Sequence, residues 1–216
     1  MGNTVGSLTQ LQRSVVIGSL LGDGYLRIVR GRKNAFLEVN HALRQKAYVD
    51  WKYSILRSIS RSAPKARSGN GNRIAYRFTT RQHPELTELF SRFYKNGRKL
   101  VPEFRADPVT IAVWFMDDGS MCRSSDVYFN TQQFDFEDQK RCMALLSEFA
   151  IESSLNRDKQ YWRIRIIKSS LPKLWTLITP NIIPAMNYKL GYNPVETHLK
   201  EWSSDNMPEL TRQLPF

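Results

Sequence analysis

The chain has 216 residues, enough to bury one sizeable hydrophobic core or two small ones. It carries 32 lysines and arginines against 20 acidic residues, a formal net charge of +12, and the basic residues are spread along the chain. A basic folded surface of this kind indicates a polyanionic partner, while two cysteines and three histidines exclude a disulfide scaffold and a zinc ribbon.

The first half of the sequence predicts alternating helices and strands. A serine cap at Ser7 with Gln10 three residues later predicts the start of a helix, which is expected to stop at Asp23 and Gly24. The elements expected after it are strands over 25–29 and 35–41 around a basic turn, a helix over 45–58, strands near 66 and over 73–80 around the loop 68–72, and a helix over 84–94.

The same order of elements then returns. Asp107 followed by Pro108 predicts a helix start, and this helix is expected to end at Asp118 and Gly119. The elements expected after it are strands near 121 and over 127–131, a helix over 137–149, strands over 153–157 and 162–168, and a helix over 171–180. We therefore predict an α+β fold in which an αββαββα unit occurs twice, with halves over 1–104 and 105–200 and a tail over 201–216.

The repeated Asp-Gly pair is the strongest candidate for chemistry. The helix macrodipole disfavours a carboxylate at the C-terminal end of a helix, and for one such pair a simple alternative is a left-handed glycine cap with a solvated aspartate. Repetition in both halves favours a functional interpretation. If the two helices pack side by side, Gly18 and Gly22 allow close approach and bring Asp23 and Asp118 together. Two such carboxylates at a basic surface predict a Mg²⁺ site for phosphodiester hydrolysis.

Two segments resemble a known family. Residues 16–24, VIGSLLGDG, and 111–119, IAVWFMDDG, resemble the paired signature helices of the LAGLIDADG homing endonucleases, in the single-chain branch whose second motif reads WFMDDG. Segments 45–53, 77–86, 130–134 and 183–190 also look like that branch, so the resemblance covers about residues 11–195. The second motif departs from the first, because Val113 and Asp117 stand where the first has Gly18 and Gly22. The helix contact is expected to be less close there.

The resemblance implies an enzyme that makes a Mg²⁺-dependent double-strand break in DNA, with the signature helices at the interface between two curved antiparallel DNA-binding sheets. Asp23 and Asp118 are the implied catalytic and metal-binding residues, and the match favours Asp118 over Asp117 as the ligand of the second motif. The residues before the two aspartates, Gly22 and Asp117, complete the predicted metal site. Mn²⁺ is expected to substitute for Mg²⁺, and Ca²⁺ to support binding without cleavage.

The resemblance also implies a basic residue beside each scissile phosphate. Lys99 and Lys189 match these positions, and they follow the two aspartates at similar distances in the sequence. Their implied catalytic role is to stabilise charge on the phosphate and to polarise the attacking water. A solvated lysine is the alternative for each of them alone, and their matching positions in both halves favour the catalytic interpretation.

Strand alternation indicates how the sheets would meet DNA. In residues 36–41, Leu37 and Val39 are expected on one face and Glu38 and Asn40 on the other, where they could read base edges. Because the two halves differ, one chain is expected to read a long non-palindromic site as a monomer. The predicted DNA-binding residues are Arg27, Arg30, Arg32, Lys33, Glu38, Asn40, Arg67, Asn70, Asn72, Arg73, Gln132, Gln133, Arg163 and Arg165.

Two alternatives use the same fold. One is a maturase that binds its host intron RNA and assists splicing, alone or in addition to cleavage. The other is a DNA-binding regulator without catalysis, which would have no physical reason to keep two converging acidic helix ends. No membrane partner is expected, since no stretch is apolar over the roughly 18 residues that a spanning helix needs. The resemblance implies an intracellular location, in an organelle (mitochondrion or chloroplast) or in a prokaryotic cytoplasm.

Overall fold

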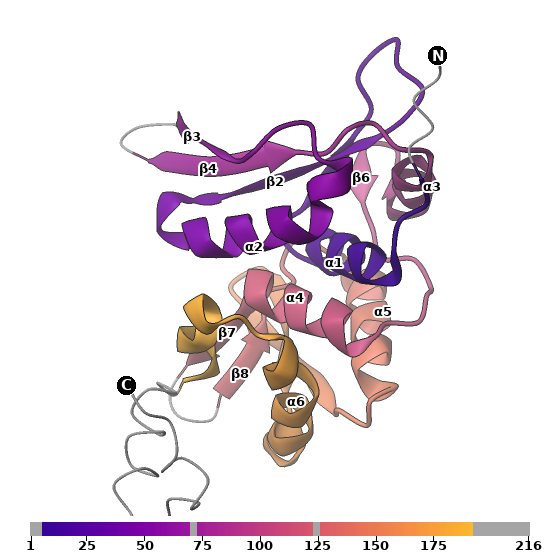
Figure 1. Ribbon diagram of the computed structural model, residues 1–216. Coiled ribbons are helices and arrows are strands. Elements are labelled where there is room, and N and C mark those ends of the chain that lie inside the picture. The colour runs from indigo at the N-terminus through magenta and orange to yellow at the C-terminus, as the bar shows by residue number, and fades with distance from the viewer. Residues whose placement is uncertain (1–5, 70–72, 123–125, 192–216) are drawn as a thin grey trace, which may run out of the picture.

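The computed structural model describes residues 6–69, 73–122 and 126–191, which form two halves with the same order of elements (Figure 1). The predicted DNA-binding residues Asn70 and Asn72 and the tail 201–216 lie outside the described residues. Across the described residues, no helix is long and apolar enough to cross a membrane.

The first half contains α1 to α3 and β1 to β6, coloured indigo to magenta in Figure 1. Their bounds are α1 (Gln10–Leu21), β1 (Tyr25–Arg27), β2 (Phe36–Ala42), α2 (Lys46–Leu56), β3 (Lys65–Ser68), β4 (Ile74–Thr79), α3 (Pro84–Phe93), β5 (Tyr94–Lys95) and β6 (Arg98–Lys99). Short 3₁₀ turns, η1 (Leu43–Gln45) and η2 (Arg57–Ile59), flank α2.

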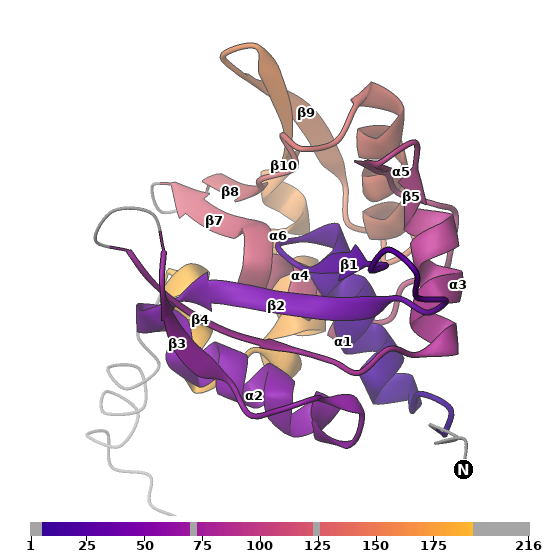
Figure 2. The ribbon, with the colours of Figure 1, turned by 90° about the horizontal axis from the view of Figure 1, so that it is seen from above.

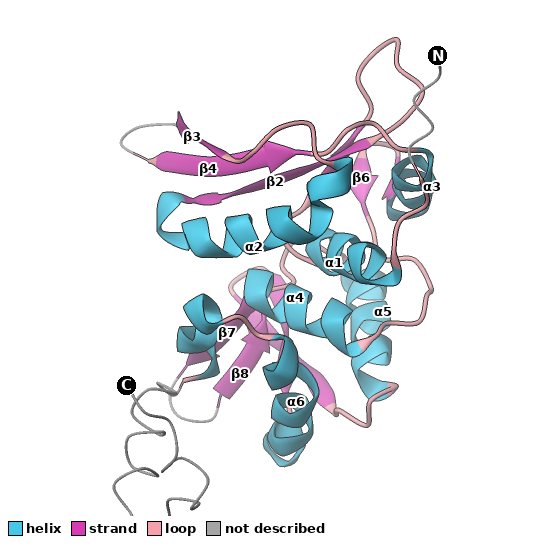
Figure 3. Cartoon of the chain, in the orientation of Figure 1, coloured by secondary structure: helices cyan, strands magenta, loops and turns pink. Residues whose placement is uncertain are grey.

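The second half repeats this order and ends in 3₁₀ turns. Figure 3 shows the helices and strands of both halves in separate colours. Its elements are α4 (Pro108–Asp118), β7 (Gly119–Cys122), β8 (Asp126–Phe129), α5 (Phe136–Ser147), β9 (Ser153–Asp158), β10 (Tyr161–Ile166), η3 (Lys168–Ser170), α6 (Leu171–Ile178), η4 (Thr179–Asn181) and η5 (Pro184–Leu190).

The two four-stranded antiparallel sheets have the same topology. Their strand orders are β1-β2-β4-β3 and β7-β8-β10-β9, so each strand of one sheet has a counterpart in the other. Figure 2 shows one sheet in each half, with α1 and α4 near the centre of the molecule. Helices α2 and α3 pack on the first sheet and α5 on the second, while α6 packs on α4. This repetition confirms the predicted pseudo-two-fold fold.

Helices α1 and α4 pack directly against each other at the pseudo-two-fold axis. A Cβ atom at Gly18 would lie 2.6 Å from the carbonyl oxygen of Thr110 and 2.7 Å from Cβ of Val113, and one at Gly22 would overlap Asp117. The glycines of α1 therefore face the larger side chains of α4. The prediction that the helix contact is less close at Val113 and Asp117 is wrong. The side chain of each residue fills the space that a glycine on the opposite side of the contact leaves open.

The simple cap interpretation of the Asp-Gly pairs is also wrong in its geometry. Gly119 has φ −66°, and Gly24 is not among the residues with positive φ. A Cβ atom at Gly24 would lie 2.7 Å from Cβ of Ser19, and one at Gly119 would overlap the ring of Phe115. Close packing against the preceding helix, and not a left-handed backbone, requires glycine at both positions.

Helix α1 begins later than the sequence predicts. Thr9 is its cap and forms a capping box with Gln12, in place of the predicted pair Ser7 and Gln10. The backbone before the helix is held by α3, since the Leu8 N–H donates to Glu85 at 2.7 Å. The other predicted helices and the strands of the two main sheets occur within a few residues of their expected bounds.

Candidate active site

The ends of α1 and α4 bring two aspartates to the centre of the molecule. Asp23 follows Gly22, the C-terminal cap of α1, and its side chain is 51% exposed. Asp118 is the last residue of α4 and is half-buried. Burial, then the charge of Asp23 and then that of Asp117, raise the pKa of Asp118 well above its usual value. Burial and the charge of Asp117 also raise the pKa of Asp23. The two carboxylates therefore lie in one acidic cluster.

A lysine from each half reaches the backbone beside each aspartate. Lys99 Nζ lies 2.7 Å from the carbonyl oxygen of Gly22 and 3.1 Å from that of Gly24. Lys189 Nζ lies 2.7 Å from the carbonyl oxygen of Asp117. Burial lowers the pKa of Lys99 to about 8 and also lowers the pKa of Lys189, although the nearby aspartates oppose this effect. Each lysine thus donates to the residue that precedes an aspartate of the Asp-Gly pair, in a pseudo-two-fold arrangement.

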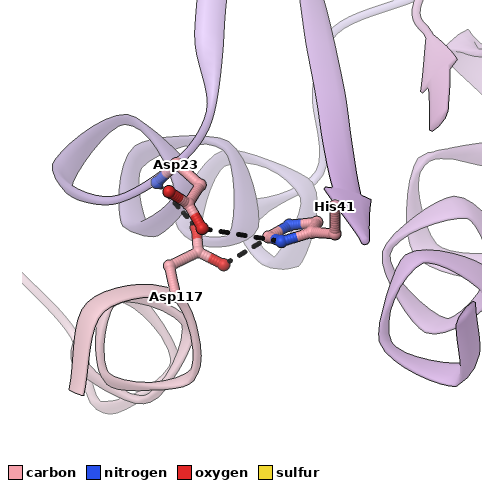
Figure 4. Close-up of side chains that lie close together, drawn as sticks. All are labelled: Asp23, His41 and Asp117. Carbon is pink, nitrogen blue, oxygen red and sulfur yellow. Dashed lines mark hydrogen bonds and ion pairs between the residues drawn. The ribbon is translucent and has the colours of Figure 1, made fainter. Parts of the chain in front are cut away.

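The Asp117 side chain breaks this symmetry (Figure 4). Its carboxylate is fully buried and accepts hydrogen bonds from Lys52 Nζ at 2.8 and 3.0 Å and from the Asp23 N–H at 3.3 Å. His41 lies beside both carboxylates, with Nδ1 3.5 Å from Asp23 and Nε2 3.7 Å from Asp117. The counterpart of Asp117 in the first motif is Gly22, which has no side chain, so this cluster exists on one side of the axis only.

Electrostatics identify Lys52 as the cation of this cluster. Burial tends to raise the pKa of Asp117, but opposing effects led by the charge of Lys52, which also donates a hydrogen bond to this carboxylate, lower the value. Burial and the Lys52 charge lower the pKa of His41 to about 4, so its imidazole is neutral at physiological pH. Oxygen and nitrogen atoms of Asp23, His41 and Asp117 lie within 4.8 Å of one another, which is a ligand set for a metal. Lys52 contacts both oxygens of Asp117, so the Asp117 carboxylate already has a cationic partner within the protein.

Sequence reasoning missed Lys52 and His41. Lys52 lies in α2 three and four residues after Val49 and Tyr48, and all three are buried. Helical periodicity places these residues on one face, so a lysine there signals a buried charge that needs a partner. His41 shares the inward face of β2 with Leu37 and Val39, which the alternation of that strand could have revealed.

Residues 13–174 match the model of the LAGLIDADG DNA endonuclease family. The chain belongs to this family. It is 28% identical over 212 residues to cytochrome b mRNA maturase bI2 of Saccharomyces cerevisiae, covering 88% of this chain and 50% of that protein. It is 27% identical over 202 residues to probable intron-encoded endonuclease 1 of Wickerhamomyces canadensis, covering 87% of each. The chain thus spans half the length of the yeast maturase and most of the endonuclease.

A solved structure agrees with these relatives. The homing endonuclease I-WcaI bound to its DNA recognition sequence is similar with a TM-score of 0.78 and 26% sequence identity, covering 86% of this chain and 88% of that one. The likeness extends over both halves of the LAGLIDADG fold.

The first sheet of this LAGLIDADG chain has the predicted alternation. Leu37 and Val39 are buried, whereas Glu38 and Asn40 lie on the outward face. Arg27 and Arg77 contact the Glu38 carboxylate from both sides, at 3.4 and 3.7 Å. Sequence reasoning named Arg27 and Glu38 but missed Arg77, whose place beside Asn40 follows only from the register of β2 with β4.

A basic groove of roughly 700 Å³ runs along this face, and a smaller hollow lined by Tyr25, Arg27, Glu38 and Asn40 joins it to Asp23. Of the predicted residues, Arg27, Arg32, Glu38 and Arg67 line the groove, while Arg30, Lys33 and Arg73 are exposed elsewhere in the first half. The basic residues of the groove that were not predicted are Arg61, Lys65, Arg77 and Arg81.

The predicted DNA-binding residues of the second half each have a partner within the protein. The Arg163 guanidinium lies 3.9 Å from the centre of the Tyr128 ring, and Arg165 donates to Asp126 at 2.6 Å. Gln132 donates to Asp158 at 3.0 Å. Its neighbour Gln133 differs, because its amide reaches the Leu21 and Gly22 carbonyl oxygens and Asp118 Oδ2 at 3.3 to 3.4 Å. Gln133 therefore belongs to the cluster of aspartates.

Proposed function

We propose that this protein is a site-specific homing endonuclease that makes a double-strand break in DNA, each half hydrolysing one strand. The observation that carries the proposal is the repeated pairing of an aspartate with a lysine, Asp23 with Lys99 and Asp118 with Lys189, at the ends of two packed helices. A hollow beside Asp23 adjoins an outward sheet face whose groove is lined by six arginines and one lysine. A polyanion lying on this face would pass both aspartates.

The acidic cluster suits a divalent cation. The raised pKa values of Asp23 and Asp118 mean that their negative charges are poorly compensated by the protein, and a cation with oxygen ligands would compensate them. We propose Mg²⁺, held by the carboxylates of Asp23 and Asp118 with the carbonyl oxygens of Gly22 and Asp117. Mn²⁺ is proposed to substitute and Ca²⁺ to permit binding without cleavage. The ion would supply a polarised water and stabilise charge on the leaving oxygen.

The protein's own residues supply the rest of the chemistry. The ammonium groups of Lys99 and Lys189 are proposed to stabilise the charge that develops on each phosphate, which a positive group does most effectively in a site screened from water. The Gln133 amide orients the Asp118 carboxylate. The Lys52–Asp117 pair fixes the backbone of Asp23 through its N–H.

The arrangement of one chain with two motifs defines the proposed target. The second motif, residues 111–119, and the first, residues 16–24, differ in sequence and surroundings, so the two half-sites need not be alike. We propose that a monomer with halves over 1–104 and 105–200 reads a long non-palindromic site.

We propose an organelle, mitochondrion or chloroplast, or a prokaryotic cytoplasm as the compartment in which the protein acts.

The test is cleavage of DNA carrying the uninterrupted allele of the locus that contains the reading frame. With Mg²⁺ or Mn²⁺ the protein should cut both strands at one site, and with EDTA or Ca²⁺ it should bind without cutting. Asp23→Asn and Asp118→Asn should each abolish the double-strand break while DNA affinity stays within about threefold, since the substitutions keep the shape of the side chain. Persistent cleavage by Asp118→Asn would contradict its assignment.

A second function has one observation in its favour, the similarity to maturase bI2 of Saccharomyces cerevisiae. In this alternative the chain binds its host intron RNA and assists splicing, alone or in addition to DNA cleavage. Tight binding to that RNA without cutting under any metal would support the maturase as the main role. Both activities in one preparation would identify a bifunctional protein.

A further inference from the structure

Lys99 is carried by a very short hairpin. Strands β5 and β6 have two residues each, and Asn96 and Gly97 form the turn between them with φ of 52° and 75°. A two-stranded hairpin of this length is marginal by itself. An external contact must therefore hold β6 for the Lys99 ammonium to stay 2.7 Å from the Gly22 carbonyl oxygen.

Within the first half, the buried Tyr94 hydroxyl of β5 accepts a hydrogen bond from the Leu26 N–H at 3.0 Å, and a carboxylate of the second half supplies the contact on the β6 side. Asp138, in α5, is 1% exposed and accepts hydrogen bonds from Arg98 Nη2 at 2.9 Å and from the Val101 N–H at 3.0 Å. These two donors lie on either side of Lys99 in the sequence. Arg98 also contacts Asp135, the cap of α5, and Arg141 donates to Asp138 from within α5 at 2.9 Å. The hairpin of one half is thus fixed to a helix of the other.

The geometry links this contact to the position of Lys99. Consecutive side chains of a strand point to opposite sides, so Arg98 points to α5 while Lys99 points to the helix ends. A shift of β6 away from α5 would therefore move the Lys99 ammonium relative to Gly22 and Asp118.

Lys189 is held differently. It lies in η5, which is anchored by Met186 and Leu190 with exposed fractions of 1% and 3% and which contacts α2. Among the described residues 6–69, 73–122 and 126–191, no ion pair joins η5 to another element. The contact with Asp138 therefore serves one lysine of the pair.

We propose that Arg98 and Asp138 are positioning residues that hold Lys99, and only Lys99, in place for cleavage of one DNA strand. This inference rests on the proposed nuclease function for its kinetic effect, but the position of Lys99 can be tested without DNA. It assigns a role to a contact between the halves that lies outside the acidic cluster.

The kinetic test uses duplex target DNA with a different label on each strand, in single-turnover reactions with Mg²⁺. Arg98→Met should slow one strand by about tenfold, because a small displacement of a catalytic group is costly, and should leave the other strand within about twofold. Nicked DNA should accumulate, and DNA affinity should not change. The slowed strand should be the one that Lys99→Met slows, and not the one that Lys189→Met slows.

Arg141→Met is the matched control. Arg141 contacts the same carboxylate at the same distance, and its side chain is 44% exposed against 55% for Arg98. Because it belongs to α5 itself, its loss should leave both strands within about twofold of the wild-type rates. Asp138→Asn, which keeps an acceptor for the Val101 N–H, should slow the same strand as Arg98→Met. Equal slowing of both strands, or of neither, by Arg98→Met would overturn the proposal.

A second measurement does not depend on cleavage. Reductive methylation followed by mass spectrometry reports how accessible each lysine amine is in the protein without DNA. Lys99 should react faster in Arg98→Met than in wild type or Arg141→Met, with Lys189 unchanged. An unchanged Lys99 rate would overturn the positioning role. If Lys99 reacts faster but wild type cuts no DNA, the nuclease proposal fails and the positioning role stands.

Discussion

Lys52 and Asp117 form a fully buried ion pair between the two halves of the protein. Lys52 Nζ lies 2.8 Å from Asp117 Oδ1 and 3.0 Å from Oδ2, and neither side chain is exposed. The ammonium also lies 4.5 Å from the centre of the Tyr48 ring. The pair joins α2 of the first half to α4 of the second. Its Asp117 carboxylate also accepts a hydrogen bond from the Asp23 N–H. One side of the pseudo-two-fold axis therefore has a buried ion pair, whereas the counterpart of Asp117 on the other side is Gly22, which has no side chain.

Removing one partner of this pair should be far more damaging than removing both. We expect Lys52→Met to lower the free energy of unfolding by about 3–5 kcal/mol, because it leaves the Asp117 carboxylate buried and unpaired. The double variant Lys52→Met/Asp117→Leu should recover more than half of this loss, since an apolar pair of similar volume has no charge to desolvate. Urea unfolding of the metal-free proteins measures both values. Equal losses in the single and double variants would contradict the predicted recovery, and with it the cost assigned to an unpaired Asp117 carboxylate.

The close packing of α1 on α4 predicts the effect of one added methyl group. Gly18→Ala should destabilise the protein by about 1–3 kcal/mol, because its Cβ would press on the Thr110 carbonyl oxygen at 2.6 Å and on Val113. Gly6→Ala is the control, since no atom lies within 4 Å of the Cβ position there. Thermal unfolding of the two variants compares them. A stability of Gly18→Ala equal to that of Gly6→Ala would mean that the helices can separate without cost.

Local patterns in the sequence predicted the framework of this site well. The Asp-Gly pairs, the glycines of α1 and the alternation of β2 each depend on a few adjacent residues, and all three occur where they were expected. The start of α1 was misplaced because Ser7 with Gln10 and Thr9 with Gln12 are equally good capping boxes. Contacts of Leu8 with Glu85 of α3, and of Gly6 with the α3 cap His83, decide between them.

Features that depend on distant partners could not be predicted in this way. Lys52 and Asp117 are 65 positions apart in the sequence, and neither residue indicates the other until the halves are packed. The β5–β6 hairpin was missed because two-residue strands are too short to show alternation. The proposed role of this hairpin in holding Lys99 is inferred from the contact of Arg98 with Asp138, which the sequence alone does not indicate.

The basic groove predicts a salt dependence that can be assigned to single residues. Arg67 is exposed on β3 and lines the groove, and its register partner Ala75 shares a face of the sheet with Arg77. If Arg67 contacts a DNA phosphate, Arg67→Gln should make the slope of log K against log salt concentration less steep by about 0.9. Arg57→Gln, in η2 next to the helix layer, should leave the slope unchanged. Fluorescence anisotropy in Ca²⁺ over a range of salt concentrations measures both. Equal changes in the two variants would indicate a non-specific effect of net charge.

Asp107 predicts a pH-dependent contribution to the contact between α1 and α4. It caps α4 through the Thr110 N–H at 2.7 Å, and it accepts hydrogen bonds from Ser14 and Gln10 of α1. Burial tends to raise the pKa of Asp107, but these hydrogen bonds, that of Ser14 first, outweigh burial and lower it below its usual value. The carboxylate therefore stabilises the fold in full above the unfolded-state pKa of about 4, and this contribution is lost as the pH falls through the lower folded-state value.

Asp107→Ala should accordingly cost about 1–2 kcal/mol at pH 7, the value of a lost helix cap with its partners, and less near pH 3. Asp107→Asn is the matched control, because asparagine also caps helices well, and it should cost less than the alanine variant at pH 7. Urea unfolding of the three metal-free proteins at both pH values gives the differences. An alanine penalty that is the same at pH 3 and pH 7 would mean that the ionised carboxylate contributes nothing beyond its shape.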